Sequence, residues 1–191
     1  ESTYPALAKV MNIGTTTEGR QIKAIKISDN VATDEPDEGD VIFFSAHHAR
    51  EWVSVEMSLY LAEYLLKNYA TNPQLGSDIN NLEIWIIPIS NPDGVFYSWS
   101  DPSVSGIRYW RKNRRDNGDG TYGVDLNRNW GYQWGIGSHS SPDTWNDEYR
   151  GPSPFSELET QAIRDFSKNV DNLKALVSYH TFSELFLRHW S

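Results

Sequence analysis

The chain has 191 residues and no cysteine, so it can form neither a disulfide framework nor a thiolate metal site. Its 26 acidic and 17 basic side chains leave a net charge of −9, which argues against nucleic acid or an anionic membrane surface as a partner. The length favours one domain, and no linker, repeat or membrane-length apolar run is visible. We therefore expect a single domain over residues 1–191, with no nucleic-acid and no membrane partner.

Strand, loop and helix follow one another in the first third of the chain. Residues 21–27 alternate apolar and polar side chains, which is typical of a half-buried strand, whereas residues 41–45 form the apolar run of a strand covered on both faces. Residues 54–69 show helical spacing, and Asn72-Pro73 marks the end of this helix. The apolar helix positions are Val55, Leu59, Ala62, Leu65 and Leu66.

A third strand and a long loop occupy the middle of the chain. Residues 83–89 are a strand candidate that ends near Pro88, because proline lacks a ladder donor. Residues 91–94, Asn-Pro-Asp-Gly, predict a turn. Residues 98–153 lack periodicity but are rich in tryptophan and tyrosine, which argues against disorder. We expect them to form an ordered, loop-built wall of a cleft.

The last third begins with a helix. Ser156 is the expected N-cap and Glu159 its capping-box partner, and the helix is predicted to end near Asn169. Residues 173–177 form another apolar, strand-like run. Strands that alternate with helices in this way predict an α/β fold with a mixed, mostly parallel sheet flanked by helices.

Polar residues that can bind a metal follow two of the predicted strands. His48 and Glu51, three residues apart, follow residues 41–45, and His180 follows residues 173–177. Two histidines and a glutamate form the three-ligand set of a zinc site with an open fourth position, and such sites gather at the carboxyl ends of strands. His47 is a competing ligand in the same loop.

Two loop segments allow a second ion site. The basic cluster at residues 108–115 could bind an anion or could be a solvated loop. Residues 116–121 are acidic and rich in glycine but do not follow the EF-hand order. They predict a tight acidic turn, with irregular calcium binding as the alternative.

Four motifs in a fixed order carry a family resemblance. They resemble the zinc metallocarboxypeptidases, the family of carboxypeptidases A and B, and most closely its bacterial secreted, carboxypeptidase T-like branch. The similarity covers nearly the whole chain. The motifs are residues 48–51 (His-Ala-Arg-Glu), 109–114 (Tyr-Trp-Arg-Lys-Asn-Arg), 125–130 (Asp-Leu-Asn-Arg-Asn-Trp) and 178–182 (Ser-Tyr-His-Thr-Phe).

The resemblance implies roles for individual residues. His48, Glu51 and His180 would bind one zinc ion, which agrees with the set derived from spacing. Asp125 would orient a zinc-bound imidazole, and Arg111 would polarise the scissile carbonyl and stabilise the oxyanion.

Three further residues match substrate-binding positions of the family. Asn127 and Arg128 would hold the terminal carboxylate of the substrate, for which the planar arginine fork is suited. Arg50 would contact the peptide further along, or form a structural ion pair.

The chain also departs from the family pattern. The general-base glutamate, a mobile tyrosine and the bottom of the specificity pocket lie beyond the last zinc histidine in the family. We therefore expect this chain to be an N-terminal portion whose C-terminal part of the fold is missing, completed by a further segment or a second chain. Glu184 is a poor substitute for the base, and Phe182 stands where many relatives have tyrosine.

The expected function is that of a secreted, zinc-dependent metallocarboxypeptidase that hydrolyses the C-terminal peptide bond of peptides. One alternative is a catalytically incompetent zinc-binding fragment or module that binds peptide C-termini. Another is a related zinc amidohydrolase that acts on cell-wall peptides or acylated amino acids.

Overall fold

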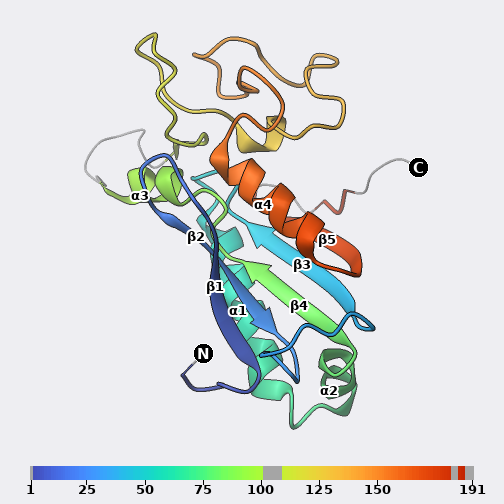
Figure 1. Ribbon diagram of the computed structural model, residues 1–191. Helices are drawn as coiled ribbons and strands as arrows, with labels where there is room; N and C mark the ends of the chain where they lie inside the picture. Colours follow the sequence, from blue (N-terminus) through green and yellow to red (C-terminus); the bar gives the residue numbers. More distant parts are fainter. Residues whose placement is uncertain (1, 101–108, 182–184, 188–191) are drawn as a thin grey trace.

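The computed structural model describes residues 2–100, 109–181 and 185–187. Figure 1 shows a five-stranded sheet with α1 and α2 on one face and α4 on the other. No helix within the described ranges is long and apolar enough to cross a membrane. The elements are β1 (Ala8–Thr15), β2 (Gln21–Ile27), β3 (Gly39–Ser45), α1 (Trp52–Asn68), α2 (Pro73–Ile79), β4 (Leu82–Ile87), α3 (Pro92–Ser100), the 3-10 helix η2 (Leu126–Arg128), α4 (Leu158–Asn169) and β5 (Leu173–Tyr179).

The sheet is mixed and flanked by helices, as predicted. Its strand order is β1-β2-β4-β3-β5. β3 pairs in parallel with β4 and β5, whereas β2 pairs antiparallel with β1 and β4. Parallel and antiparallel pairings are therefore equally frequent, so the parallel share is smaller than in the mostly parallel sheet that the sequence suggested.

The middle of the sheet is buried on both faces. In β3, Ile42 and Phe44 pack with Ile163 of α4, whereas Phe43 packs into the core that contains Leu65 of α1. Successive strand side chains point to opposite faces, so an apolar run supplies both cores at once. Burying such a side chain fully contributes roughly 1.5–3 kcal/mol. The prediction of a strand covered on both faces is confirmed for residues 41–45.

The helix predicted at residues 54–69 is α1, with two corrections. Leu59 is 44% exposed, whereas Ser58 is wholly buried and its hydroxyl contacts Ser45 of β3. Asn72 does more than follow the end of α1, because its side chain accepts the backbone N–H groups of Gln74 and Leu75 and so begins α2. Neither α2 nor β1 was predicted.

The turn predicted at residues 91–94 is wrong, because this segment begins α3. The Asn91 side chain accepts the Gly94 N–H at 2.9 Å, and Pro92 occupies the first helical position, where its missing N–H costs nothing. The same side chain donates to the carbonyls of His47 and Lys112. These two bonds hold the Asn91 amide in place, and its oxygen caps the start of α3.

The capping box predicted for α4 is also wrong. Glu157 is the N-cap residue, and its side chain makes no capping hydrogen bond. The Ser156 hydroxyl donates to Glu157 Oε1 at 2.6 Å and accepts from Asn129 Nδ2 at 2.8 Å, and Glu159 is buried beside Asn113. The predicted end at Asn169 is confirmed.

Candidate metal centre

The ends of β3 and β5 bring the predicted metal residues to one place. Ser45 of β3 lies opposite Tyr179 of β5 in a parallel pairing, so the chain leaves both strands at the same edge of the sheet. After β3 the backbone turns at Ala46, which has a φ of 53°. The Ser54 hydroxyl holds this turn, because it accepts from Ala46 N and donates to Glu51 O. His180 directly follows β5 and therefore faces the turn.

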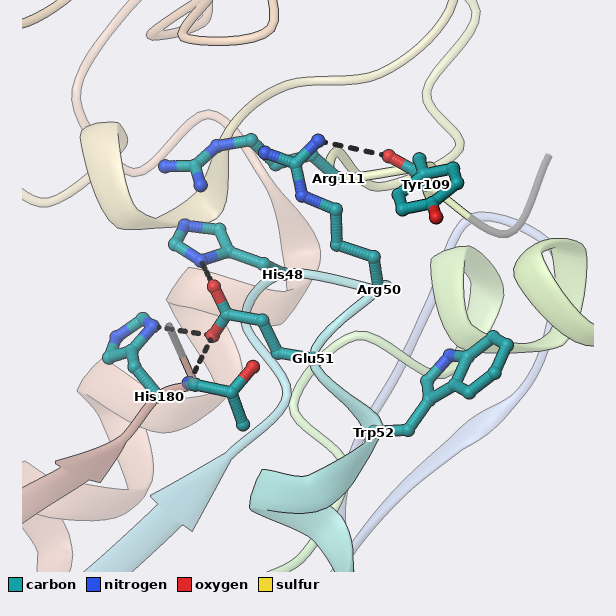
Figure 2. A pocket seen from close by; sticks show the side chains of 8 residues that line it. His48, Arg50, Glu51, Trp52, Tyr109, Arg111 and His180 are labelled. Carbon is teal, nitrogen blue, oxygen red and sulfur yellow. Dashed lines mark hydrogen bonds and ion pairs between the residues drawn. The ribbon is translucent and has the colours of Figure 1, made fainter. Parts of the chain in front are cut away.

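Three potential metal donors converge at this edge (Figure 2). His48 Nδ1 lies 2.7 Å from Glu51 Oε1, and His180 Nδ1 lies 2.9 Å from Glu51 Oε2. The Thr181 N–H also donates to Glu51 Oε2, at 3.2 Å. One donor atom from each of His48, Glu51 and His180 lies within 4.8 Å of the others. The spacing argument thus predicted a real cluster.

Asp125 joins the cluster to Arg111. Its Oδ1 lies 3.2 Å from His48 Nε2, and its Oδ2 accepts from Arg111 Nε at 2.9 Å. Asp125 is wholly buried, and Oδ1 also accepts the Asn127 N–H, which starts η2. The start of η2 therefore fixes the carboxylate that faces His48.

Charge and burial oppose each other in this cluster. Burial would raise the pKa of Glu51, but the hydrogen bonds from His180 and His48 outweigh it, and the pKa lies well below its usual value. Burial would likewise raise the pKa of Asp125, yet His48 and Arg111 lower it. Burial lowers the pKa of His48, whereas the bonds to Asp125 and Glu51 raise it above its ordinary value. The carboxylates are thus held ionised, which is the form that binds metal.

His47, the competing ligand, lies outside the group of converging donors. Its side chain is buried, and its ring stacks on the His180 ring with centroids 5.7 Å apart. Burial, followed by the charges of His180 and His48, lowers the pKa of His47 well below its usual value. Of the two adjacent histidines, His48 therefore belongs to the group of potential metal donors, whereas His47 packs against the His180 ring.

An open cavity of about 780 Å³ lies over the cluster. Arg50 lines this cavity, donates to Tyr109 O at 3.1 Å and pairs with Asp147 at 3.3 Å. The structural ion pair is therefore present, and the contact with a peptide stays a prediction. Trp52 and Thr181 also line the cavity but were not singled out from the sequence, although each directly follows a metal candidate. The lining residues are His48, Arg50, Glu51, Trp52, Tyr109, Arg111, His180 and Thr181.

Asn127 and Arg128 are not among the residues that line this cavity. The Arg128 guanidinium donates to His139 O at 2.6 Å and to Glu148 Oε1 at 2.9 Å. It is therefore occupied by partners in the loop wall, and its assignment to a substrate carboxylate stays a prediction.

The basic cluster does not form one anion site. Arg111 pairs with Asp125 and Arg115 with Glu157, whereas Arg114 stacks on the Tyr97 ring with its guanidinium carbon 3.7 Å from the centroid. Arg108 lies outside the described residues. The described cations point to different partners, so the anion-site alternative is not supported.

The acidic segment at residues 116–121 is a tight turn. Asp119 accepts the N–H and the hydroxyl of Thr121 and the hydroxyl of Thr144, and Asp116 accepts the Gly118 N–H. Two groups of three metal-type donors occur among the described residues, and this segment belongs to neither. Calcium binding at residues 116–121 is therefore not supported.

Comparison with known proteins identifies the family. The family model described as zinc carboxypeptidase matches residues 1–191. The chain belongs to the zinc carboxypeptidase family. A zinc carboxypeptidase of Saccharothrix mutabilis subsp. capreolus is 39% identical over 96% of this chain. The crystal structure of carboxypeptidase A from Helicoverpa armigera matches 95% of the chain with a TM-score of 0.83 and 35% identity.

Two features of the relatives limit what membership implies. The chain spans 42% of the length of the Saccharothrix protein and 42% of the Helicoverpa chain. An inactive metallocarboxypeptidase, ecm14 of Talaromyces marneffei, is 31% identical over the whole of this chain. Two imidazole nitrogens and a carboxylate beside an open cavity suit the zinc ion that the family name implies.

Proposed function

We propose that this chain carries the metal centre and part of the substrate cleft of a secreted, zinc-dependent carboxypeptidase that hydrolyses the C-terminal peptide bond of peptides. The observation that carries the proposal is the convergence of two histidine Nδ1 atoms on the Glu51 carboxylate beneath a cavity that Arg111 also lines. Secretion rests only on the resemblance to the bacterial branch of the family.

Each residue of the cluster has a task in this proposal. His48, Glu51 and His180 would hold zinc, which when bound supplies a Lewis acid and lowers the pKa of water. Asp125 accepts from His48 Nε2, so Nδ1 stays free to face the metal. Arg111 reaches the cavity while Asp125 holds its Nε, and its guanidinium would stabilise the negative charge that develops on the substrate carbonyl.

The substrate's free carboxylate is assigned to Asn127 and Arg128, and Arg50 to a contact further along the peptide. Arg128 is paired with Glu148, whose side chain is 47% exposed. Such exposed pairs are worth about 0–1 kcal/mol, so a substrate carboxylate could replace Glu148 at small cost. The paired state is compatible with a clamp that closes on the chain end.

A module that binds peptide C-termini without cleaving them is the second candidate. Among the described residues that line the cavity, Glu51 is the one carboxylate, and its oxygens face the two histidines. A general base would therefore come from outside this lining. A relative that is named an inactive metallocarboxypeptidase supports a candidate without turnover.

A further segment or a second chain is part of the same proposal. β5 lies at the end of the strand order, and Leu173 and Leu176 are 38% and 43% exposed. An uncovered apolar edge strand readily pairs with another chain. A partner that pairs with β5 would lie next to His180 and could contribute to the cavity.

The decisive experiment compares peptides that differ only at their C-terminus. For the chain together with the segment or second chain that completes it, we expect hydrolysis of a peptide with a free carboxylate, none of its amidated form, and loss of activity with a zinc chelator. Tight binding of the free-carboxylate peptide without turnover would favour the binding module, and cleavage of both peptides would favour another amidohydrolase. Intact mass spectrometry of the same sample would reveal a second chain.

A matched pair of arginine variants tests the carboxylate clamp. We expect Arg128→Ala to raise KM for the free-carboxylate peptide at least about 10-fold, because a charge-assisted bidentate pair is lost. Arg164→Ala is the control, since Arg164 pairs with exposed Asp165 on α4. Equal KM values for the two variants would remove Arg128 from the proposal.

A further inference from the structure

His47 is a buried imidazole beside the metal cluster that the proposed function leaves without a role. It is 1% exposed, and its ring meets Phe44 and Trp130 edge-on, with centroids 4.7 and 5.6 Å away. Its Nε2 atom is buried and has no hydrogen-bond partner among the residues that the structure describes. An unpaired buried polar group costs about 1–3 kcal/mol, so a leucine or phenylalanine would be the less costly occupant unless the imidazole has a task.

His47 also contacts His180, through a stack of the two rings and through the Ser178 hydroxyl. The two rings are stacked with an interplanar angle of 13°. The Ser178 hydroxyl lies between their edges, 3.1 Å from His180 Nε2 and 3.4 Å from His47 Nδ1. Ser178 and His180 are two residues apart along the chain, so the period of the strand places them on the same face.

We propose that Ser178 and His47 are positioning residues that hold the His180 ring with Nδ1 facing Glu51. They would do for His180 what Asp125 does for His48, because Asp125 contacts His48 Nε2 and leaves Nδ1 facing Glu51. Both histidines of the cluster then present Nδ1 to the metal and Nε2 to a partner outside it. The inference rests on the proposed zinc site.

A hydroxyl is suited to this position because it donates one hydrogen bond and accepts others. When His180 Nδ1 binds a metal, Nε2 carries the ring proton and donates it to Ser178 Oγ. The Ser178 proton is then donated to His47 Nδ1, which leaves the His47 proton on its partnerless Nε2. This series of hydrogen bonds, from His180 through Ser178 to His47, therefore places the last proton on His47 Nε2, the buried atom without a partner among the described residues.

The stack adds a steric restraint to the hydrogen bonds. His180 follows an edge strand, and its side chain is 30% exposed, whereas that of His48 is 4% exposed. Rotation of His180 about its side-chain bonds would break its contact with the His47 face. His47, fixed by Phe44 and Trp130, therefore supplies a rigid surface for the more exposed histidine.

Zinc affinity of the chain, measured by competition with a chromophoric chelator, tests the inference without requiring turnover. We expect Ser178→Ala to weaken zinc binding about 10-fold, the lower end of the range for partners of ligating histidines. Ser178→Thr keeps the hydroxyl and should bind zinc like the unaltered chain. Because Ser178 is exposed, the thermal unfolding midpoint of both variants should stay unchanged.

His47 variants show whether the two residues act together. His47→Asn keeps an acceptor close to the position of Nδ1, whereas His47→Leu removes it, so zinc should bind more weakly to the leucine variant. The double variant His47→Leu with Ser178→Ala should bind zinc no more weakly than the single variant with the lower affinity. The losses of affinity should not add, because the two residues belong to one series of hydrogen bonds. The visible spectrum of the cobalt-loaded chain should change in the same variants.

The outcomes distinguish the positioning role of Ser178 and His47 from the zinc site itself. Equal zinc affinity for the unaltered chain and Ser178→Ala would overturn the positioning role and leave the zinc site standing. So would fully additive losses in the double variant. If the unaltered chain binds no zinc, the proposed function fails and the positioning role fails with it.

Discussion

The floor and the wall of the cavity are built in different ways. The floor, which we define as residues 46–51 together with His180, is placed by strand pairing, because β3 and β5 run in parallel and end at the same edge. The wall, residues 109–157, contains the short helix η2 and is held mainly by hydrogen bonds from side chains. Backbone register fixes the candidate metal donors, whereas single polar side chains hold the loops of the wall in place.

Asn129 shows how the wall is held. It is wholly buried, and its amide takes part in five hydrogen bonds that join the end of η2 to the loop before α4 and to the start of α4. Its Nδ2 donates to Arg150 O, Ser153 O and Ser156 Oγ, and its Oδ1 accepts from Glu157 N and Thr160 Oγ1. One side chain therefore holds together segments of the wall, whereas strand pairing holds the segments of the floor.

The largest expected effect breaks the floor alone. Glu51→Gln should weaken zinc binding more than about 100-fold, because it removes the negative ligand itself rather than a partner of a ligand. The wall should stay folded, as judged by tryptophan fluorescence. Glu56→Gln, on the exposed side of α1, is the control. Zinc bound equally by both variants would mean that Glu51 is not a ligand.

The next effect breaks the wall alone. Asn129→Ala should lower the free energy of unfolding by about 3 kcal/mol, because several buried backbone groups lose their partners together. Urea denaturation measures this loss, with exposed Asn30→Ala as the control. Zinc affinity of the folded protein should fall far less than in Glu51→Gln. A loss below about 0.5 kcal/mol would show that the wall does not depend on this residue.

The wall should also respond to pH through Glu159 of α4, whose carboxylate accepts a hydrogen bond from Asn113 of the wall. Burial, which outweighs the hydrogen bond from Asn113, raises the pKa of Glu159 from 4.5 to about 7. In the unfolded chain the carboxyl ionises near 4.5, so the folded state loses stability between pH 4.5 and 7 and carries a full penalty above pH 7, on the order of 3 kcal/mol. Below pH 4.5 both states are protonated and the penalty vanishes.

Glu159→Gln tests this expectation. The variant should flatten the decrease in stability between pH 5 and pH 8 and should be more stable than the unaltered chain at pH 8. Urea midpoints at the two pH values measure the change. Glu148→Gln, which alters a 47% exposed carboxylate of the wall itself, is the control. An unchanged pH slope in Glu159→Gln would contradict the raised pKa.

The smallest effect concerns the one carboxylate of the wall that reaches the floor. Asp125→Asn should weaken zinc binding about 10–100-fold, because a neutral amide orients His48 less strongly than a carboxylate. Asp147→Asn is the control, since Asp147 is 63% exposed and pairs with the partly exposed Arg50 outside the metal cluster. A loss in Asp125→Asn as large as in Glu51→Gln would mean that wall and floor are not separable.

The floor was predictable from the sequence because its signals are local. Residues 41–45 and 173–177 are apolar runs, and His48, Glu51 and His180 follow them directly. Parallel strands that end at one edge then bring their following residues together. The position of His47 was not predictable, because the two histidines are adjacent in the sequence and only the folded chain shows that His47 packs on His180 while His48 faces Glu51.

The wall and the helix starts depend on distant partners and were predicted less well. The Asn91 amide that caps α3 is held by the carbonyls of His47 and Lys112, and Ser156 is engaged by Asn129 instead of capping α4. The pairing of Arg128 with Glu148 likewise joins residues 20 positions apart. Short-range patterns contain no information about such partners, so the turn and the capping box were wrong.

The central claim is that His48, Glu51 and His180 bind zinc through the two Nδ1 atoms and the carboxylate. Anomalous diffraction at the zinc edge, on crystals of the chain grown with zinc, tests it most directly. We predict one strong peak about 2.0–2.2 Å from His48 Nδ1, His180 Nδ1 and a Glu51 oxygen. A peak at His47, at the group formed by Asp29, Glu35 and Glu38, or no peak at all would contradict the claim.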